Sequence, residues 1–172
     1  MHLSLTQTTI ATQTYWLGQT ANGLAFVGRA NGPKDEWRDF FPAATATVEP
    51  NANQAAQAVL RDFLTGKTLR FDAPLDDTVG TAFQRQVWAI LRTIPYGQQV
   101  SYQQVALQLN RPTAVRAVAH AIARNPCLIA TPCHRVVRQD GTLGGYRGGL
   151  PMKRALLALE ARTIKTRTSL PE

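Results

Sequence analysis

The spacing of apolar residues changes from one half of the chain to the other. In residues 3–10, 13–20 and 23–30, polar and apolar residues alternate with the period of two that is typical of strands. In residues 82–94, apolar side chains recur at three- and four-residue steps, as on one face of a helix. The sequence therefore predicts a mixed α/β fold of the α+β type, with a small sheet first and helices after it.

Turn-forming and helix-ending residues divide the chain further. The TANG turn between the second and third predicted strands favours a small antiparallel sheet. Residues 53–66 predict a helix that begins at Asn53 and ends at Gly66, and the acidic, breaker-rich segment 72–81 predicts a domain boundary. We expect an N-terminal structural domain with a sheet and a helix in residues 1–75, a C-terminal domain in residues 76–162, and a flexible tail in residues 163–172.

Two short helices are predicted in the second half, with a break between them. Ser101, followed three residues later by Gln104, forms a capping box at the start of the first helix. The sequence NRPT ends that helix, and residues 114–124 predict the next one. Two short helices joined by a tight turn are a helix-turn-helix pattern, which many DNA-binding proteins use.

Positive charge gathers in this second half. Residues 1–80 carry 6 Lys and Arg against 8 Asp and Glu, whereas residues 81–172 carry 13 against 3. This asymmetry indicates a polyanionic partner, and a charge that only keeps the protein in solution is the alternative. On the second helix of the pair, cations alternate with small residues that would let DNA approach closely. These residues are Arg116, Ala117, His120, Ala123 and Arg124.

The chain shows no leader sequence and no membrane span, so we expect a cytoplasmic protein. No run approaches about 18 apolar residues, and the N-terminus lacks the regions of a signal peptide. In that compartment Cys127 and Cys133 are expected to be reduced thiols. Their spacing fits no zinc site, and we predict no metal.

Cys133 lies between Pro132 and His134 in an apolar run. Either it is a buried small residue, or it is a nucleophile that is activated by the neighbouring imidazole. An imidazole that acts as a base needs an orienting group, commonly a carboxylate. Glu160, a lone acid in the helical sequence KRALLALEAR, is the candidate.

The motifs of the second half occur together in a known family. FQRQVW, IPYGQQVSYQQVA, AVRAVAHAIARNP, PCHRVV, GTLGGYRGGL and KRALLALE follow one another in the order found in the O6-alkylguanine-DNA alkyltransferases. The chain resembles this family strongly over residues 81–162 and only in general character before them. The resemblance implies a ribonuclease H-like N-terminal domain, a monomer without cofactors, and double-stranded DNA as partner. It also implies DNA repair by irreversible, stoichiometric transfer of an alkyl group to a cysteine.

The resemblance assigns a role to each matching residue of the reaction centre. Cys133 would accept the alkyl group, with His134 as a water-mediated base and Glu160 as the group that orients it. Asn125 would stabilise the active-site turn. Tyr102 would rotate the phosphate beside the target nucleotide and give a proton to the departing base.

The resemblance also implies how DNA is held. Arg116 would enter the duplex from the minor groove and fill the gap that the flipped base leaves, with Ala117, Ala123 and Arg124 contacting DNA beside it. The loop that closes over the flipped base would be formed by Tyr146, Arg147 and Gly148, with Lys153 near the guanine pocket.

Two positions depart from the family pattern. Thr131 stands where relatives commonly carry Val or Ile, and Arg147 stands where they often carry a small residue. We expect Arg147 either to add a phosphate contact or to narrow the pocket against bulky adducts. The choice between O6-alkylguanine and O4-alkylthymine, and cooperativity on DNA, stay open. The zinc-binding N-terminal extension of the regulatory relatives has no counterpart, so no role in activating transcription is expected.

Two other classes of function compete with this interpretation. A helix-turn-helix protein that only binds DNA would use the same basic helix and would tolerate the loss of Cys133. A cysteine hydrolase of the thiol-protease type would need an oxyanion hole and a histidine distant in the sequence. Neither His2 nor His120 lies in such a context.

Overall fold

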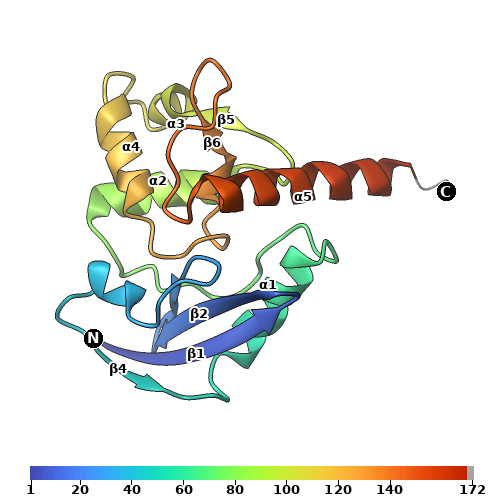
Figure 1. Ribbon diagram of the computed structural model, residues 1–172. Coiled ribbons are helices and arrows are strands. Elements are labelled where there is room, and N and C mark those ends of the chain that lie inside the picture. Colours follow the sequence, from blue (N-terminus) through green and yellow to red (C-terminus); the bar gives the residue numbers. More distant parts are fainter. Residues whose placement is uncertain (170–172) are drawn as a thin grey trace.

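The two halves of the chain form two layers that lie against each other in the computed structural model, which describes residues 1–169 (Figure 1). One layer is a four-stranded sheet in the order β3-β2-β1-β4, and the other holds most of the helices. The strands of the sheet are β1 (His2–Ile10), β2 (Gln13–Thr20), β3 (Gly23–Val27) and β4 (Thr45–Val48).

Strands β1 to β3 form the predicted antiparallel meander. In β1 and β2, buried residues such as Leu3, Leu5 and Leu17 are interspersed with more exposed ones, whereas every residue of β3 is buried. A fourth strand that the sequence did not predict, β4, extends this sheet by pairing with β1 in parallel. Most residues of β4 are exposed, so its sequence lacks the apolar alternation that identifies the other strands.

Helix α1 (Gln54–Leu64) lies against β1, at the predicted position. Asn53 occupies the N-cap position of α1, but the Asn53 side chain makes no capping hydrogen bond to the helix. Its amide Nδ2 donates instead to Ser4 O at 3.0 Å and to Thr6 Oγ1 at 3.2 Å, which ties the start of α1 to β1. The helix ends before Gly66, which has a φ of +73° that favours glycine.

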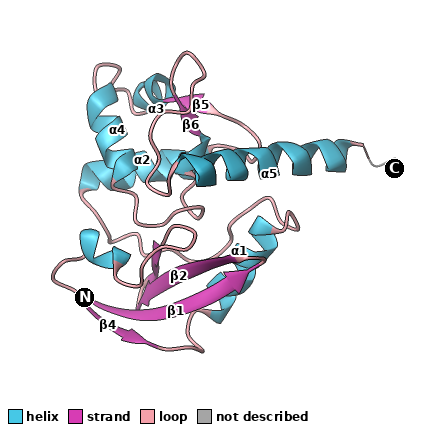
Figure 2. Ribbon diagram, in the orientation of Figure 1, coloured by secondary structure: helices cyan, strands magenta, loops and turns pink. Residues whose placement is uncertain are grey.

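The second half is mainly helical, as Figure 2 shows. Its helices are α2 (Ala82–Thr93), α3 (Tyr102–Gln108), α4 (Val115–Ala123) and α5 (Leu150–Thr168). Capping boxes begin α2 and α3, the second of them at the predicted pair Ser101 and Gln104. Helices α3 and α4 form the predicted helix-turn-helix, and the Trp88 Nε1 of α2 donates to Ala121 O at 2.9 Å. Helix α4 is thereby fixed on α2, with one face left to solvent.

Helix α5 continues well past the residue at which we predicted a flexible tail. Ile164 packs against the core, and Arg167 Nη2 donates to Gly66 O at 3.1 Å and to Lys67 O at 2.7 Å. These contacts hold the last turns of α5 on the loop after α1, so the expected tail from residue 163 is wrong as far as Thr168. Residues 170–172 of that prediction lie outside the described residues.

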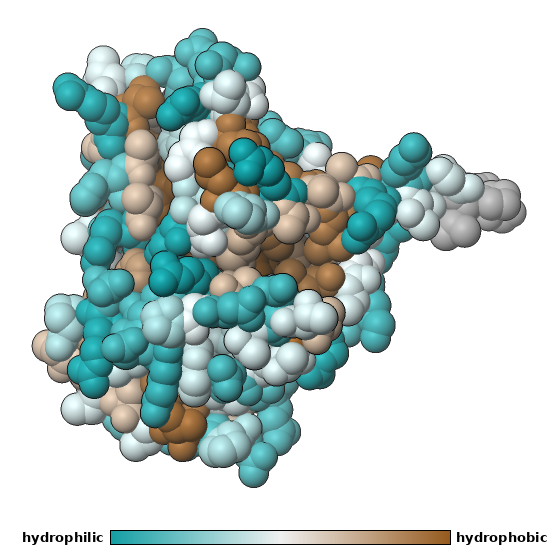
Figure 3. Space-filling model, viewed as in Figure 1, coloured by the Kyte–Doolittle hydropathy of each residue, from teal (hydrophilic) through white to brown (hydrophobic). Residues whose placement is uncertain are grey.

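The layers are joined along the outer edge of β3. Leu24 N donates to Pro74 O at 2.9 Å, and Val27 N donates to Pro126 O at 3.0 Å. The first bond involves the segment between the halves, and the second involves the turn after α4. Apolar residues also line a hollow below α5, where the layers meet (Figure 3). Within residues 1–169, no helix is both long enough and apolar enough to cross a membrane.

Candidate active site

The predicted acceptor cysteine lies at the end of a buried turn that follows α4. Cys133 begins a short 3-10 helix (Cys133–Arg135), and β6 (Val136–Val137) comes next and pairs in parallel with β5 (Val100–Ser101). All residues from 125 to 137 are buried, and Cys133 is 4% exposed. The backbone is tightly bent, because Thr131 N donates to Cys127 O at 3.0 Å and Cys133 N donates to Thr131 O at 2.7 Å.

Asn125 organises this turn from within. Its Nδ2 donates to Cys133 Sγ at 3.2 Å, to Thr131 O at 3.0 Å and to Cys127 O at 3.2 Å. Its Oδ1 accepts from Cys127 N at 3.0 Å. One buried amide therefore fixes both the backbone of the turn and the position of the sulfur.

His134 and Glu160 come together as the sequence suggested, although they lie 26 residues apart. The imidazole Nε2 lies 2.6 Å from Glu160 Oε1, and both side chains are fully buried. Burial lowers the pKa of His134, while the hydrogen bond and charge of Glu160 oppose that shift. Among residues 1–169, His134 Nδ1 has no hydrogen-bond partner. A neutral imidazole that donates from Nε2 presents Nδ1 as an acceptor, which is the form a base requires.

Arg135 is a member of this cluster that the sequence analysis missed. Its guanidinium donates to both carboxylate oxygens of Glu160, at 2.9 to 3.1 Å, and to Ile94 O at 2.6 Å. Gly97 N donates to Glu160 Oε2 at 2.8 Å. Burial alone would raise the pKa of Glu160, but the bonds from His134 and Arg135 lower it below the ordinary value. The carboxylate is therefore ionised and can stabilise a positive charge on His134.

The Cys133 thiol is protonated at rest, because burial raises its pKa. The bond from Asn125 and the charges of Arg147 and Lys153 oppose this shift and favour the thiolate. The pKa of Tyr102 is also raised, first by burial and then by the negative charge that Cys133 carries as a thiolate. The half-buried Tyr102 at the start of α3 therefore stays a protonated hydroxyl.

Lys153 holds the glycine-rich loop against the turn. Its Nζ donates to Val136 O at 2.6 Å, to Gly145 O at 3.3 Å and to Leu143 O. Burial lowers the pKa of Lys153 to about 8. These bonds place the loop over the site, and the Lys153 Nζ lies 6.0 Å from the centre of the Tyr146 ring.

The next part of the loop is packed closely enough to require a glycine. A Cβ added at Gly148 would lie 2.5 Å from Met152 Sδ and 2.7 Å from Tyr146 Cε1. The hydroxyl of Tyr146 is buried and has no partner within residues 1–169. The predicted pocket residues Tyr146, Gly148 and Lys153 thus lie together.

Arg147 points away from this group. It pairs with Glu36 and donates to the carbonyls of Val27, Asn125 and Pro126. Its side chain is 11% exposed. The guanidinium is bound inside the protein, so the side chain does not extend to solvent as a phosphate contact would require. No local sequence pattern could reveal these partners.

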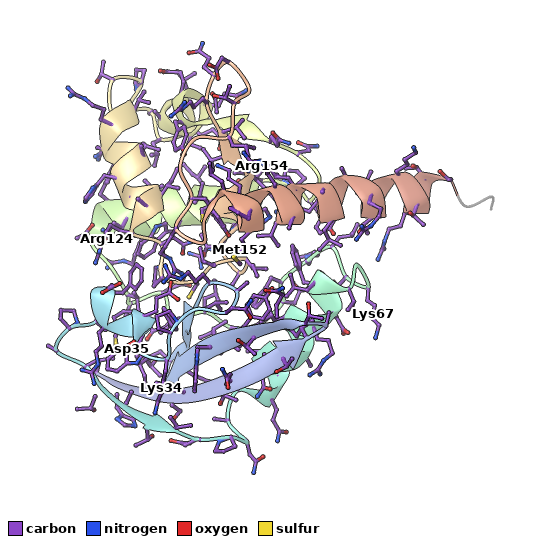
Figure 4. All side chains as sticks on the ribbon, viewed as in Figure 1. Lys34, Asp35, Lys67, Arg124, Met152 and Arg154 are labelled. Atoms are coloured by element: carbon purple, nitrogen blue, oxygen red, sulfur yellow. The ribbon has the colours of Figure 1, made fainter. Side chains whose placement is uncertain are left out.

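Helix α4 presents part of the predicted DNA-binding surface. Arg116, Ala117, His120 and Ala123 are exposed on one face. Arg124 departs from that face, because its Nη2 donates to Asp39 O at 2.7 Å and its guanidinium lies 5.0 Å from the Phe40 ring centre. Figure 4 shows Arg124 at the end of α4, above the segment that carries Asp35.

Comparisons with known proteins agree with this geometry. Residues 82–162 match the family model "6-O-methylguanine DNA methyltransferase, DNA binding domain". The chain is 43% identical to the inducible methylated-DNA–protein-cysteine methyltransferase of Bacillus subtilis, over 86% of this chain and 84% of that protein. It is 50% identical to the bifunctional transcriptional activator/DNA repair enzyme Ada of Escherichia coli, over 73% of this chain but only 35% of that protein.

A solved structure extends the likeness to the whole fold. The crystal structure of Mycobacterium tuberculosis OGT in complex with DNA superposes with a TM-score of 0.80 at 34% identity. The superposition covers 95% of this chain and 94% of that one. The similarity therefore includes the N-terminal layer, where the sequence motifs are weak.

Proposed function

Since the chain belongs to the methylated-DNA–protein-cysteine methyltransferase family, we propose that it repairs DNA by moving an alkyl group from guanine O6 to Cys133. The observation that carries this proposal is the arrangement of Cys133, His134 and Glu160. A buried thiol adjoins, in the sequence, an imidazole whose Nε2 is held by a carboxylate and whose Nδ1 has no partner among the described residues. These groups supply a nucleophile, a base and a counter-charge.

The reaction is a single displacement at carbon. His134 Nδ1 takes the thiol proton through a water molecule, and Glu160 stabilises the imidazolium that forms. The sulfur then forms a bond to the alkyl carbon as the bond from that carbon to guanine O6 breaks. Tyr102 gives a proton to the departing guanine, and the proton from Cys133 restores the hydroxyl. The net result is a thioether on the protein and an unmodified base, with no cofactor required.

The lesion must leave the base stack for this chemistry to occur. Arg116 and the small residues Ala117 and Ala123 are exposed on one face of α4. We propose that this face enters the minor groove of double-stranded DNA. In this proposal Arg116 fills the space left by the flipped base, and the loop with Tyr146 and Gly148 covers it. The protein acts in the cytoplasm as a monomer, once per molecule, because a thioether is not hydrolysed.

The test is mass spectrometry of the intact protein after incubation with a duplex that carries one O6-methylguanine. We expect a mass gain of one CH₂ per molecule, located on Cys133 by peptide mapping, with no second equivalent consumed. An undamaged duplex is the control for non-specific modification. An unmodified protein that still binds the damaged duplex would overturn the proposal and leave a DNA-binding module.

A further inference from the structure

Arg147 donates hydrogen bonds to backbone carbonyls in both halves of the chain. Its Nη2 donates to Val27 O at 2.8 Å, at the end of β3, and to Pro126 O at 3.0 Å. Its Nε donates to Asn125 O at 3.0 Å. One planar guanidinium therefore fixes the last residue of the sheet edge relative to the first residues of the active-site turn.

Glu36, in the N-terminal half, determines where this guanidinium lies. Its Oε1 pairs with Arg147, and its Oε2 accepts from Arg29 N at 3.1 Å. The carboxylate is almost fully buried, and the Phe40 ring centre lies 4.7 Å from the Arg147 guanidinium carbon. A buried ion pair gives little net stability, because both charges must be desolvated. The geometry of the Glu36–Arg147 pair is nevertheless well defined, because the guanidinium nitrogens of Arg147 all have acceptors.

Asn125 connects this cluster to the sulfur. The residue accepts from Arg147 at its backbone oxygen and donates from its side chain to Cys133 Sγ at 3.2 Å. A shift of the Asn125 backbone would therefore move the amide that donates to the thiol. Because a hydrogen bond to sulfur favours the thiolate, such a shift would change the reactivity of Cys133.

We propose that Arg147 is a positioning residue for the Cys133 thiol, and that Glu36 extends this control to the N-terminal half of the chain. Arg147 acts through Asn125 rather than on the substrate. The effect on thiol reactivity stands by itself, whereas the effect on alkyl transfer rests on the proposed function.

Other charged or titratable groups also face Cys133, and the test must leave them unchanged. They are His134 beside it, Lys153 on α5, Tyr102 on α3 and Tyr146 in the loop. Arg147→Lys keeps a positive charge but loses the planar fork, so it separates geometry from charge. Glu36→Gln keeps the shape of the partner and touches no group in that set.

The experiment measures the reaction of native protein with iodoacetamide at a series of pH values, without DNA, with Cys133 labelling followed by mass spectrometry. We expect Arg147→Lys and Glu36→Gln to move the half-maximal pH upward by about 0.5–1, because the Asn125 donor is less well placed. The matched control is Arg167→Lys, which alters hydrogen bonds to Gly66 O and Lys67 O near the end of α5, away from the turn. It should react like the wild type.

A second measurement uses the methylated duplex. Both variants should transfer the methyl group about 3- to 10-fold more slowly at saturating DNA, with an unchanged Kd, because α4 is not altered. Lower melting temperatures with wild-type labelling pH and wild-type transfer rate would show a purely structural role and overturn the inference. If the wild type itself takes up no methyl group, the proposed function fails, while the labelling comparison still decides the role of Arg147.

Discussion

The two cysteines of the turn show how different two buried thiols can be. Cys127 and Cys133 are both nearly inaccessible, and one Asn125 side chain contacts both residues. Cys127 Sγ lies 3.8 Å from Leu24 O, and burial raises its pKa to about 12. Cys133 receives the amide hydrogen bond on its sulfur and precedes the imidazole. Because burial is common to both, we expect any difference in reactivity to come from the donors around each sulfur.

The largest expected effect comes from removing each thiol in turn. Cys133→Ala should abolish methyl transfer, whereas Cys127→Ala should transfer one methyl group per molecule as the wild type does. The measurement is intact-protein mass spectrometry with the methylated duplex, and circular dichroism confirms folding. A methyl group found on Cys127 in the Cys133→Ala protein would contradict the expectation that only Cys133 accepts the methyl group.

The second effect concerns Glu160, whose carboxylate contacts His134, the residue that follows Cys133. Glu160→Gln keeps the side-chain shape but removes the charge that stabilises a protonated His134. The transfer rate should fall by about 10²-fold or more, the usual contribution of a general base. Single-turnover kinetics on the folded fraction measure this, with the exposed Asp140→Asn as control. An undiminished rate would remove His134 from its proposed role.

A smaller effect should come from altering the Asn125 amide, which bonds to the Cys133 sulfur and to the Cys127 backbone. Asn125→Asp keeps an oxygen to accept from Cys127 N but replaces the donor beside Cys133 Sγ. The pKa of Cys133 should rise, so its thiolate appears only at higher pH, and at neutral pH transfer slows by about 10-fold. Iodoacetamide labelling against pH measures this, and Cys127 should stay unlabelled below about pH 9. An unchanged pH profile would show that the amide does not control the sulfur.

The smallest effect is expected at Thr131, between the two cysteines. Its backbone N and O make the bonds of the turn, and valine would keep both. Thr131→Val should change the free energy of unfolding by less than about 1 kcal/mol and leave the transfer rate within about twofold. Chemical denaturation and single-turnover kinetics test this. A large loss of rate would give the hydroxyl a role that the turn geometry does not require.

Much of the fold could be predicted because its signals are local. The alternation in β1 and β2, the helical spacing in α2 and the capping box of α3 each depend on neighbours in the sequence. Strand β4 escaped prediction, because its pairing partner β1 lies more than 40 residues away and its own residues are mostly exposed. The end of α5 was not predicted for the same reason, because it is held by contacts with the loop after α1, about 100 residues away in the sequence.

The site was predictable to the extent that chemistry limits the choice of residue. Glu160 could be proposed because residues 81–172 contain only three acids. Arg135 and Arg147 could not be placed correctly, since a cation in a sequence shows neither its acceptors nor whether it is buried. Both bind carboxylates distant in the chain, Glu160 and Glu36. A single signal could have found Arg135, namely a cation inside an otherwise apolar run.

The hydrogen bonds along the outer edge of β3 also bear on aggregation. An open edge strand offers unpaired amides and carbonyls to other chains, and proteins commonly cover such edges. Here the segment at Pro74 covers one end of β3, and the turn at Pro126 covers the other. A fragment that ends at residue 75 would keep the segment at Pro74 but lose the turn at Pro126, which would leave the Val27 end of β3 open. The active-site turn therefore also pairs with backbone groups of this edge strand that would otherwise be free to pair with another chain.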